Sequence, residues 1–379
     1  MVVDYIKQRF KKPQNDMRYR SIWQYIHVDT ILMFCLALLF SAGLCILYSA
    51  SNESFSTIQN QLLRVGLAFV VMIMVAQVPP TTLQRWAPLI YTLGVLLLII
   101  VLFIGHIGKG GQRWLTMGIL RFQPAELLKL AIPMFLAWYC HRIYLPISTK
   151  TVLIAAPIIL IPVILTAKQP DLGTAIILLI AGASVLFLAG LSWRLMSLLA
   201  GILLMCTPLL WFVMYDYQRN RVLTFFNPER DPLGKGYHII QSKIAIGSGG
   251  LFGKGWLNGT QSHLHFLPEH KTDFIFAVCG EEFGFIGCLA VITLCMLIVA
   301  RGWYITLHAQ DTFSRLLAGS ITLSFFVSFF INMGMVTGIL PVVGLPLPFI
   351  SYGGSSLMTL MVSFGILMSI QTHKKLMTT

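Results

Sequence analysis

Long apolar runs alternate with short polar segments along the whole chain. Each run has about 18 residues or more, the length of an α-helix that crosses the hydrocarbon core of a bilayer. We therefore predict about ten membrane-spanning helices, which leave little chain for a separate soluble domain. The expected spans are 29–49, 60–78, 84–105, 124–141, 151–167, 171–190, 192–214, 273–300, 313–335 and 353–371.

The composition agrees with an all-α polytopic membrane protein. Apolar residues make up 56% of the chain and charged residues 11%, against about 25% charged residues in soluble domains. The first apolar run is too long for the core of a cleaved signal peptide, so it is expected to remain as a helix. The cysteines lie in or beside apolar spans and form no C-x-x-C pair, which is typical of small buried side chains. We expect residues 1–379 to form a single transmembrane domain.

The net charge of +13 indicates how the helices are oriented. Lysines and arginines gather at both termini and in alternate short loops, whereas the loops at 50–59 and 336–352 contain none. By the positive-inside rule, both termini are expected on the cytoplasmic side. Two external segments depart from this pattern because they are basic, the loop at 106–123 and a long loop at 215–272. Basic residues there suit an anionic ligand such as a lipid phosphate, and nucleic acid is not expected as a partner.

A single carboxylate, Asp273, stands where the long external loop runs into the eighth apolar span. An ionised carboxylate at a membrane edge is costly unless water, a cation or a reacting group balances it. Proton transfer on a membrane-bound substrate needs a carboxylate in such a place. The alternative is a helix cap, because Thr272 and Asp273 are both good capping residues. The sequence leaves both interpretations open.

Further charged groups stand at the external ends of other spans. Glu126 and Lys129 are i, i+3 partners on one face of the fourth span. They form either a structural ion pair or part of a reaction centre, and we favour the second because Lys129 projects into an otherwise apolar helix. Asp171 is expected to cap the sixth span. The predicted topology puts Asp171, Glu126 and Asp273 on the same side of the membrane.

Several other segments have roles that the sequence leaves open. Glu281 and Glu282 lie in a stretch that is longer than a bilayer requires, and Gly280 is a candidate position for a break in that helix. The segment 337–356 is rich in proline and glycine yet carries no charge. We expect its backbone either to line a cavity at membrane depth or to pack on the bundle. Three histidines have a spacing that fits no standard metal site; they are His263, His265 and His270.

Several motifs, in order along the chain, resemble those of the SEDS family (shape, elongation, division and sporulation proteins) over essentially its full length. They are Gly111-Gln-Arg113-Trp114-Leu with Arg121-Phe-Gln-Pro-Ala-Glu126, Lys168-Gln-Pro-Asp171-Leu-Gly, Leu267-Pro-Glu-His-Lys-Thr-Asp273-Phe-Ile-Phe, and Asn332-Met-Gly-Met through Ser351-Tyr-Gly-Gly-Ser-Ser. The segments 237–250 and 340–348 are more similar to the elongation branch of the family than to its division branch. One departure is Met333, where the family commonly has valine.

The resemblance implies a peptidoglycan glycosyltransferase of the bacterial inner membrane, with its active site facing the periplasm. Such an enzyme polymerises lipid II into glycan strands during cell elongation and rod-shape maintenance, and it releases undecaprenyl pyrophosphate. The implied partners are a class B penicillin-binding protein, which is a transpeptidase, and other membrane proteins of the rod complex. Two other functions stay open: lipid II flipping or another lipid-transport role, and a structural scaffold for the elongation machinery.

The resemblance also implies roles for particular residues. Asp273 is the essential acidic residue, and Glu126 and Lys129 belong to the central cavity, with Asp171 as a supporting residue. A sugar hydroxyl must lose a proton as it attacks the anomeric carbon of the lipid-linked glycan, so Asp273 is the candidate general base.

Negative charge develops on the pyrophosphate as it leaves, and Arg or Lys side chains or a divalent cation can stabilise it. The sequence candidates for stabilising this charge are Lys129, Arg113, Arg219 and Arg221. The last two have an alternative role, which is to anchor a helix end among lipid headgroups. Neither the sequence nor the resemblance establishes a metal ion.

Overall fold

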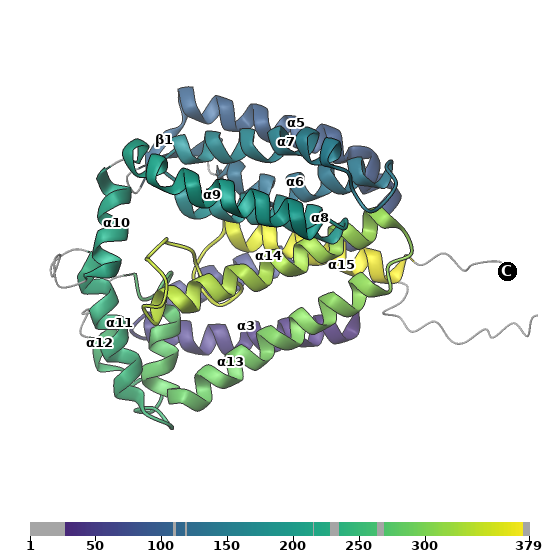
Figure 1. The fold of residues 1–379 in the computed structure, drawn as a ribbon. Helices are drawn as coiled ribbons and strands as arrows, with labels where there is room; N and C mark the ends of the chain where they lie inside the picture. The colour runs from purple at the N-terminus through teal and green to yellow at the C-terminus, as the bar shows by residue number, and fades with distance from the viewer. Residues whose placement is uncertain are drawn as a thin grey trace, which may run out of the picture.

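The computed structural model describes residues 27–108, 111–117, 120–214, 216–227, 235–263 and 269–373. They form a bundle of long helices whose axes are roughly aligned, with shorter helices at one end (Figure 1). Ten helices coincide with the ten predicted spans, so the helical fold is confirmed. They are α3 (Thr30–Ala50), α4 (Phe55–Ala76), α5 (Pro80–Ile104), α6 (Pro124–His141), α7 (Thr149–Lys168), α8 (Leu172–Leu188), α9 (Trp193–Val213), α13 (Ile275–Leu307), α14 (Thr312–Val336) and α15 (Ser355–Thr372).

The predicted number of membrane spans is approximate. Within the described residues, seven helices are long and apolar enough to cross a membrane by length and composition alone: α3, α4, α5, α7, α13, α14 and α15. α8 is apolar but shorter, with 17 residues. Seven such helices establish a multi-pass membrane protein, and α6, α8 and α9 lie among them in the same bundle.

Local sequence signals set where several helices begin. Asp29, Asp171 and Asp311 are the N-caps of α3, α8 and α14, and each carboxylate accepts a hydrogen bond from the backbone N–H three residues further on. Pro124 is the first residue of α6, a position where its missing N–H costs no hydrogen bond. Because a side-chain cap stabilises a helix by about 1 kcal/mol, these residues define helix starts that the apolar pattern leaves uncertain.

Apolar side chains in the interior hold the bundle together. α14 packs against α6, α8 and α13, and α15 packs against α4, so α14 and α15 lie near the centre (Figure 1). Phe325 of α14 is buried and contacts the rings of Phe329 and Phe364. Many Leu, Ile and Phe side chains on the outside stay exposed, as expected where lipid chains surround the protein.

The two ends of the bundle collect different loops. At one end, where α3 begins and α13 ends, Nη2 of Arg301 lies 2.6 Å from Oδ2 of Asp29. At the other end, Arg113 contacts the turn at 169–171, and residues 271–273 contact the segment 337–354. These contacts agree with the predicted alternation of loops between two sides of the membrane. Which side is cytoplasmic stays a prediction.

The two basic segments expected on the external side contain secondary structure that the sequence did not predict in full. The loop at 106–123 contains three antiparallel strands, β1 (His106–Gly108), β2 (Gly111–Met117) and β3 (Leu120–Phe122), in the order β1-β2-β3. The long loop contains α10 (Asp216–Phe226), α11 (Lys235–Gly249) and α12 (Thr260–His263). α11 packs on α13. Residues 228–234 and 264–268, including His265, lie outside the described residues.

α13 is broken, but not at the predicted position. The break falls at Gly284, whose φ of 63° is outside the helical range, and not at Gly280. Residues 250–255, which follow α11, pack on this break and form the covering segment. The carbonyls of Gly250 and Leu251 accept hydrogen bonds from the backbone N–H groups of Phe285 and Ile286 at 3.0 and 3.2 Å. The covering segment therefore replaces helix hydrogen bonds that the break removes.

Candidate active site

Asp273 lies in a turn immediately before α13. The N-cap of α13 is Phe274, and it makes no side-chain capping hydrogen bond, so the interpretation of Asp273 as the helix cap is wrong. The side chain is half-buried. Its Oδ2 lies 3.5 Å from the position that a Cβ atom would take at Gly344, whose φ of +82° favours glycine. The carboxylate is therefore packed against the irregular segment 337–354.

The backbone of the Asp273 turn is held by three consecutive hydrogen bonds. The carbonyl of Lys271 accepts from the N–H of Tyr352 at 2.9 Å. The carbonyl of Thr272 accepts from Oγ of Ser351 at 2.5 Å. The carbonyl of Asp273 accepts from Nδ2 of Asn332 at 2.9 Å.

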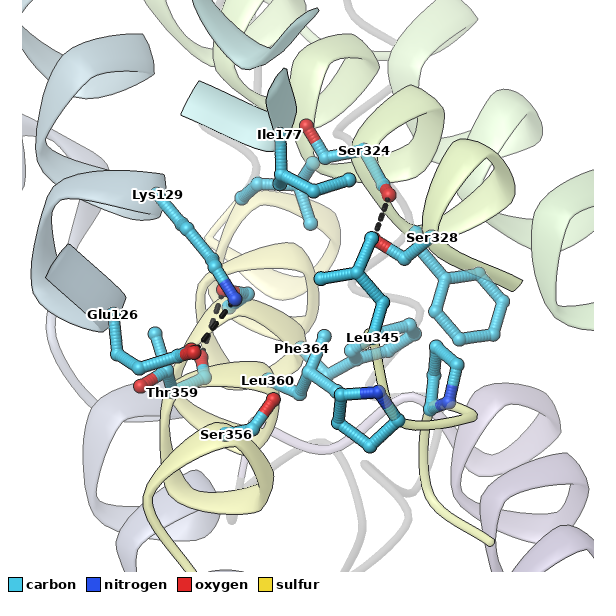
Figure 2. Close-up of a pocket in the computed structure, with 15 residues that line it drawn as sticks. Glu126, Lys129, Ile177, Ser324, Ser328, Leu345, Ser356, Thr359, Leu360 and Phe364 are labelled. Carbon is cyan, nitrogen blue, oxygen red and sulfur yellow. Dashed lines mark hydrogen bonds and ion pairs between the residues drawn. The ribbon is translucent and has the colours of Figure 1, made fainter. Parts of the chain in front are cut away.

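A pocket of about 660 Å³, a volume that includes space open to solvent, is lined in part by Leu345, which Asn332 joins to the Asp273 turn. Asp273 itself is not among its lining residues. Figure 2 shows Glu126 and Lys129 of α6 on one side of it, with Ser324 and Ser328 of α14 across from them. Leu345, two prolines of the same irregular segment and the first turns of α15 complete the lining. The prediction that this segment lines a cavity is therefore confirmed.

Glu126 and Lys129 form the predicted ion pair. Nζ of Lys129 lies 2.7 Å from Oε1 of Glu126, and the side chains are 19% and 7% exposed, respectively. Both residues line the pocket, and the dashed line in Figure 2 marks their contact. The pair is thus both a structural ion pair and a part of the cavity wall, so the two alternatives of the sequence do not exclude each other.

Asp171 caps α8 as predicted, and it also binds two segments that are distant in sequence. Its carboxylate accepts from the N–H of Thr174 at 3.2 Å and from Nε2 of Gln123 at 2.9 Å. Nη1 of Arg113 lies 3.7 Å from Oδ1. Arg113 also donates to the carbonyls of Gln169 and Pro170. The cluster fixes β2 and the start of α6 to the start of α8, and it does not line the pocket.

The two arginines of α10 have different partners. Arg219 donates from Nε to the carbonyl of Trp211 and from Nη2 to that of Phe212, both at 2.8 Å. It therefore binds the C-terminal end of α9, in keeping with the alternative role of a helix-end anchor. Arg221 donates from Nη1 to the carbonyl of Val343 at 2.9 Å, one residue before the glycine that Asp273 contacts. Their binding of pyrophosphate stays a prediction.

Glu281 and Glu282 are both buried next to the break in α13. Oε1 of Glu281 accepts from Nζ of Lys254 at 2.8 Å and from Oγ1 of Thr260 at 2.9 Å. Glu282 accepts from the hydroxyl of Ser49 on α3. The sequence left the role of these two residues open. In the structure Glu281 attaches the covering segment to α13, and Glu282 attaches α3 to it.

The described residues do not provide a metal site of the usual kind. Within the described ranges, no group of three or more His, Cys, Asp or Glu residues converges on a point that could hold an ion. The divalent cation considered from the sequence therefore has no cluster of ligands in this part of the chain.

The structure brings together some of the candidate residues and separates others. Glu126 and Lys129 share the pocket, Arg113 and Asp171 share the second cluster, and Asp273 and Arg221 meet the same irregular segment. The sequence analysis named Asn332 and Ser356 only as parts of a family motif, and it assigned no role to them or to the other pocket hydroxyls. These side chains are polar residues inside apolar spans, which is the signal that could have identified them.

Comparisons with known proteins match this fold and these motifs. A family model described as "Cell cycle protein", FtsW/RodA/SpoVE, matches residues 23–376. The chain is 50% identical over 360 residues to "Peptidoglycan glycosyltransferase MrdB" of Escherichia coli K12, covering 94% of this chain and 97% of that protein. It is 36% identical to "Probable peptidoglycan glycosyltransferase FtsW" of Geobacter metallireducens, covering 92% and 95%.

Two solved structures have the same fold. One, from work titled "Structural coordination of polymerization and crosslinking by a peptidoglycan synthase complex", has a TM-score of 0.79 and 32% identity, covering 92% of this chain and 99% of that one. The rod shape determining protein RodA of Thermus thermophilus has a TM-score of 0.70 and 27% identity, covering 92% and 98%. The motifs, the fold and these full-length matches agree: the chain belongs to the FtsW/RodA/SpoVE family of cell cycle proteins, the SEDS family.

Proposed function

We propose that this chain is a peptidoglycan glycosyltransferase that polymerises lipid II during cell elongation, with Asp273 as its general base. The observation that carries the proposal is the 50% identity to the E. coli glycosyltransferase over 94% of the chain. The closeness of the Asp273 turn to a pocket lined by polar side chains supports it. Residues 1–379 act as one transmembrane domain, in which the segment 215–272 contributes to the external side of the site.

The reaction needs one proton transfer and one substitution. A sugar hydroxyl attacks the anomeric carbon of a second, lipid-linked glycan; the new glycosidic bond forms as the bond to pyrophosphate breaks. The hydroxyl proton passes to the carboxylate of Asp273, and undecaprenyl pyrophosphate leaves with the bonding electron pair. General base catalysis by a placed carboxylate contributes about 10²–10⁴-fold to such a rate.

The leaving pyrophosphate requires positive charge nearby. Arg221 is the favoured candidate because it contacts the same segment as Asp273. Arg113 is paired with Asp171, and Arg219 donates to a carbonyl at the end of α9. To bind phosphate, each arginine would have to share or release these contacts. Lys129 contributes charge to the pocket, while its pairing with Glu126 leaves that site nearly neutral overall.

The partner that this proposal includes is a class B penicillin-binding protein. One structural neighbour comes from work on a peptidoglycan synthase complex that coordinates polymerisation and crosslinking, which supports a crosslinking partner here. Other membrane proteins of the rod complex are further expected partners. The chain resides in the bacterial inner membrane, with the Asp273 turn and the pocket facing the periplasm, where lipid II is available after flipping.

The test is polymerisation of fluorescent lipid II by the purified protein, with and without its class B partner, resolved on a gel. Wild-type protein is expected to make long glycan strands. Asp273→Asn should lower the rate by about 100-fold or more, with a melting temperature close to that of wild type. Asp311→Asn is the matched control: it makes the same chemical change at the cap of α14, at the opposite end of the bundle, and asparagine retains capping ability.

Three outcomes would contradict parts of this proposal. Absence of polymer from wild-type protein with its partner would remove the enzymatic assignment and favour lipid II flipping or a scaffold. Movement of lipid II across vesicle membranes, measured in the same preparation without polymer formation, would identify the transport alternative. Polymer formation by Asp273→Asn at nearly the wild-type rate would reject the general-base role alone.

A further inference from the structure

The carboxylate of Asp273 is carried by a turn whose position depends on contacts from other elements. The residue lies two positions before the first residue of α13. The N–H groups of Thr272 and Phe274 close the turn on the carbonyl of Glu269, whereas the carbonyls of residues 271–273 are held by side chains and backbone from outside the turn. A reacting group that is misplaced by about 1 Å can lose about 100-fold in rate. The side chains that hold this turn therefore bear directly on the reaction.

Asn332 of α14 makes the first of these contacts. It is fully buried, and its Nδ2 donates to the carbonyl of Asp273 at 2.9 Å and to the carbonyl of Leu345 at 2.6 Å. Both partners only accept hydrogen bonds, so the amide must turn its nitrogen toward them. Because Leu345 lines the pocket, one side chain fixes the turn of the carboxylate relative to the pocket wall.

Ser351 makes the second contact. Its Oγ donates to the carbonyl of Thr272 at 2.5 Å and accepts from the N–H of Leu347 at 2.8 Å. It is also buried. Asn332 and Ser351 thus connect the same two stretches of backbone, the turn at 272–273 and the segment at 345–347. Asn332 does so from α14, and Ser351 from the irregular segment itself. Together they leave the turn little freedom to shift along the pocket wall.

We infer that Asn332 and Ser351 are positioning residues for the carboxylate of Asp273, and this inference rests on the proposed function. Neither side chain abstracts the proton. Both act through backbone carbonyls that set where the carboxylate stands. A purely structural role predicts a different result, because loss of a buried hydrogen bond then lowers the melting temperature but leaves the turnover of the folded protein unchanged.

The experiment measures glycan polymerisation against lipid II concentration for Asn332→Leu and Ser351→Ala, with the full chain and its class B partner. Leucine has nearly the shape of asparagine and no N–H donor. Ser320→Ala is the matched control: Ser320 is a fully buried hydroxyl of α14 that donates to the carbonyl of Ala181 at 2.9 Å, about three helical turns along α14 from Asn332. Melting temperature and monodispersity are recorded for every variant.

A positioning role predicts that kcat falls by about tenfold or more for Asn332→Leu and by a smaller factor for Ser351→Ala. The lipid II concentration at half-maximal rate should change less than threefold, and Ser320→Ala should retain wild-type kcat. Wild-type kcat in folded Asn332→Leu would overturn the inference. If Asn332→Leu does not fold, Ser351→Ala decides, since it removes one hydroxyl, and wild-type kcat there would overturn it. Inactive wild-type protein would instead reject the proposed function, and this inference with it.

Discussion

The ion pair of Glu126 and Lys129 is a short-range feature with consequences for activity. Removal of Lys129 leaves a buried carboxylate without its cation, and removal of Glu126 leaves a cation in an apolar helix; both are costly. We predict that Glu126→Ala and Lys129→Ala each lower the polymerisation rate, and that the double variant is less impaired than the sum of the two effects. The non-additive part should be at least about 1 kcal/mol of activation free energy.

A double-mutant cycle on initial polymerisation rates measures this coupling. The cycle needs all four proteins at the same partner concentration and at saturating lipid II. Simple additivity would show that the two side chains act on separate steps, despite the 2.7 Å between Nζ and Oε1.

Arg221 and Arg219 offer a comparison between two arginines on one helix turn of α10. We predict that Arg221→Ala raises the lipid II concentration at half-maximal rate by about tenfold, because a charged hydrogen-bond donor is lost. Arg221→Lys should raise it less, since lysine keeps the charge but lacks the planar fork that binds two phosphate oxygens. Rates against lipid II concentration measure both effects.

Arg219→Lys is the control for this pair, because the bonds of Arg219 go to the end of α9. It should change the melting temperature more than the use of lipid II. Identical curves for wild type, Arg221→Ala and Arg221→Lys would exclude a pyrophosphate role for Arg221.

At the scale of elements, the break in α13 depends on a glycine. A Cβ atom at Gly284 would lie 2.3 Å from the backbone nitrogen of Gly253, and the φ of +63° is unfavourable for any other residue. We predict that Gly284→Ala destabilises the protein by at least about 2 kcal/mol. Thermal unfolding in detergent measures the effect.

Gly247→Ala is the matched control, because a Cβ there meets nothing within 4 Å and the residue lies inside α11. Alanine is favoured over glycine in a helix by about 1 kcal/mol, so this variant should be neutral or slightly stabilised. Equal melting temperatures for the two variants would mean that the covering segment adapts to a side chain at Gly284.

The sequence predicted the helices well because each one carries its own signal. An apolar run needs no information from the rest of the chain, and Asp171 identifies the start of α8 by local capping chemistry. The strands at 106–122 were missed because they are three to seven residues long and the pattern of apolar residues does not show which strands pair. The break in α13 was expected at Gly280 and lies at Gly284, because its position is set by a segment about thirty residues earlier that packs its glycine-rich backbone against α13.

Apart from one ion pair, the candidate site could be predicted only as a set of single residues. Glu126 and Lys129 were predicted as a pair because they are three positions apart on one helix. The contacts of Asp273 were not, because Asn332 is 59 positions away and α13 and α14 must fold together before the two can meet. The same is true of Arg113 and Asp171, which the sequence assigned to different tasks and the fold places in one cluster.

At the scale of the whole molecule, the orientation in the membrane decides which substrate the site can reach. Ser56 and Ser192 are both exposed and lie at opposite ends of the bundle by the order of the helices. We predict that Ser56→Cys, in a background without native cysteines, reacts with a membrane-impermeant maleimide in intact spheroplasts. Ser192→Cys should react only after lysis, since its loop is expected in the cytoplasm.

Labelling intensity on a gel, before and after lysis, measures both positions. The opposite pattern would put the Asp273 turn on the cytoplasmic side and would contradict polymerisation of flipped lipid II.

The length of α13 has a consequence for where the reaction takes place. A straight helix of its 33 residues would extend about 50 Å, whereas the hydrocarbon layer is about 30 Å thick. The part after Gly284 is long enough to cross that layer alone, so the part before the break can stand outside the hydrocarbon layer. The lipid tail anchors each incoming sugar at the height of the headgroups. We therefore expect the broken helix to hold the carboxylate of Asp273, which precedes its first part, at the depth of the lipid headgroups.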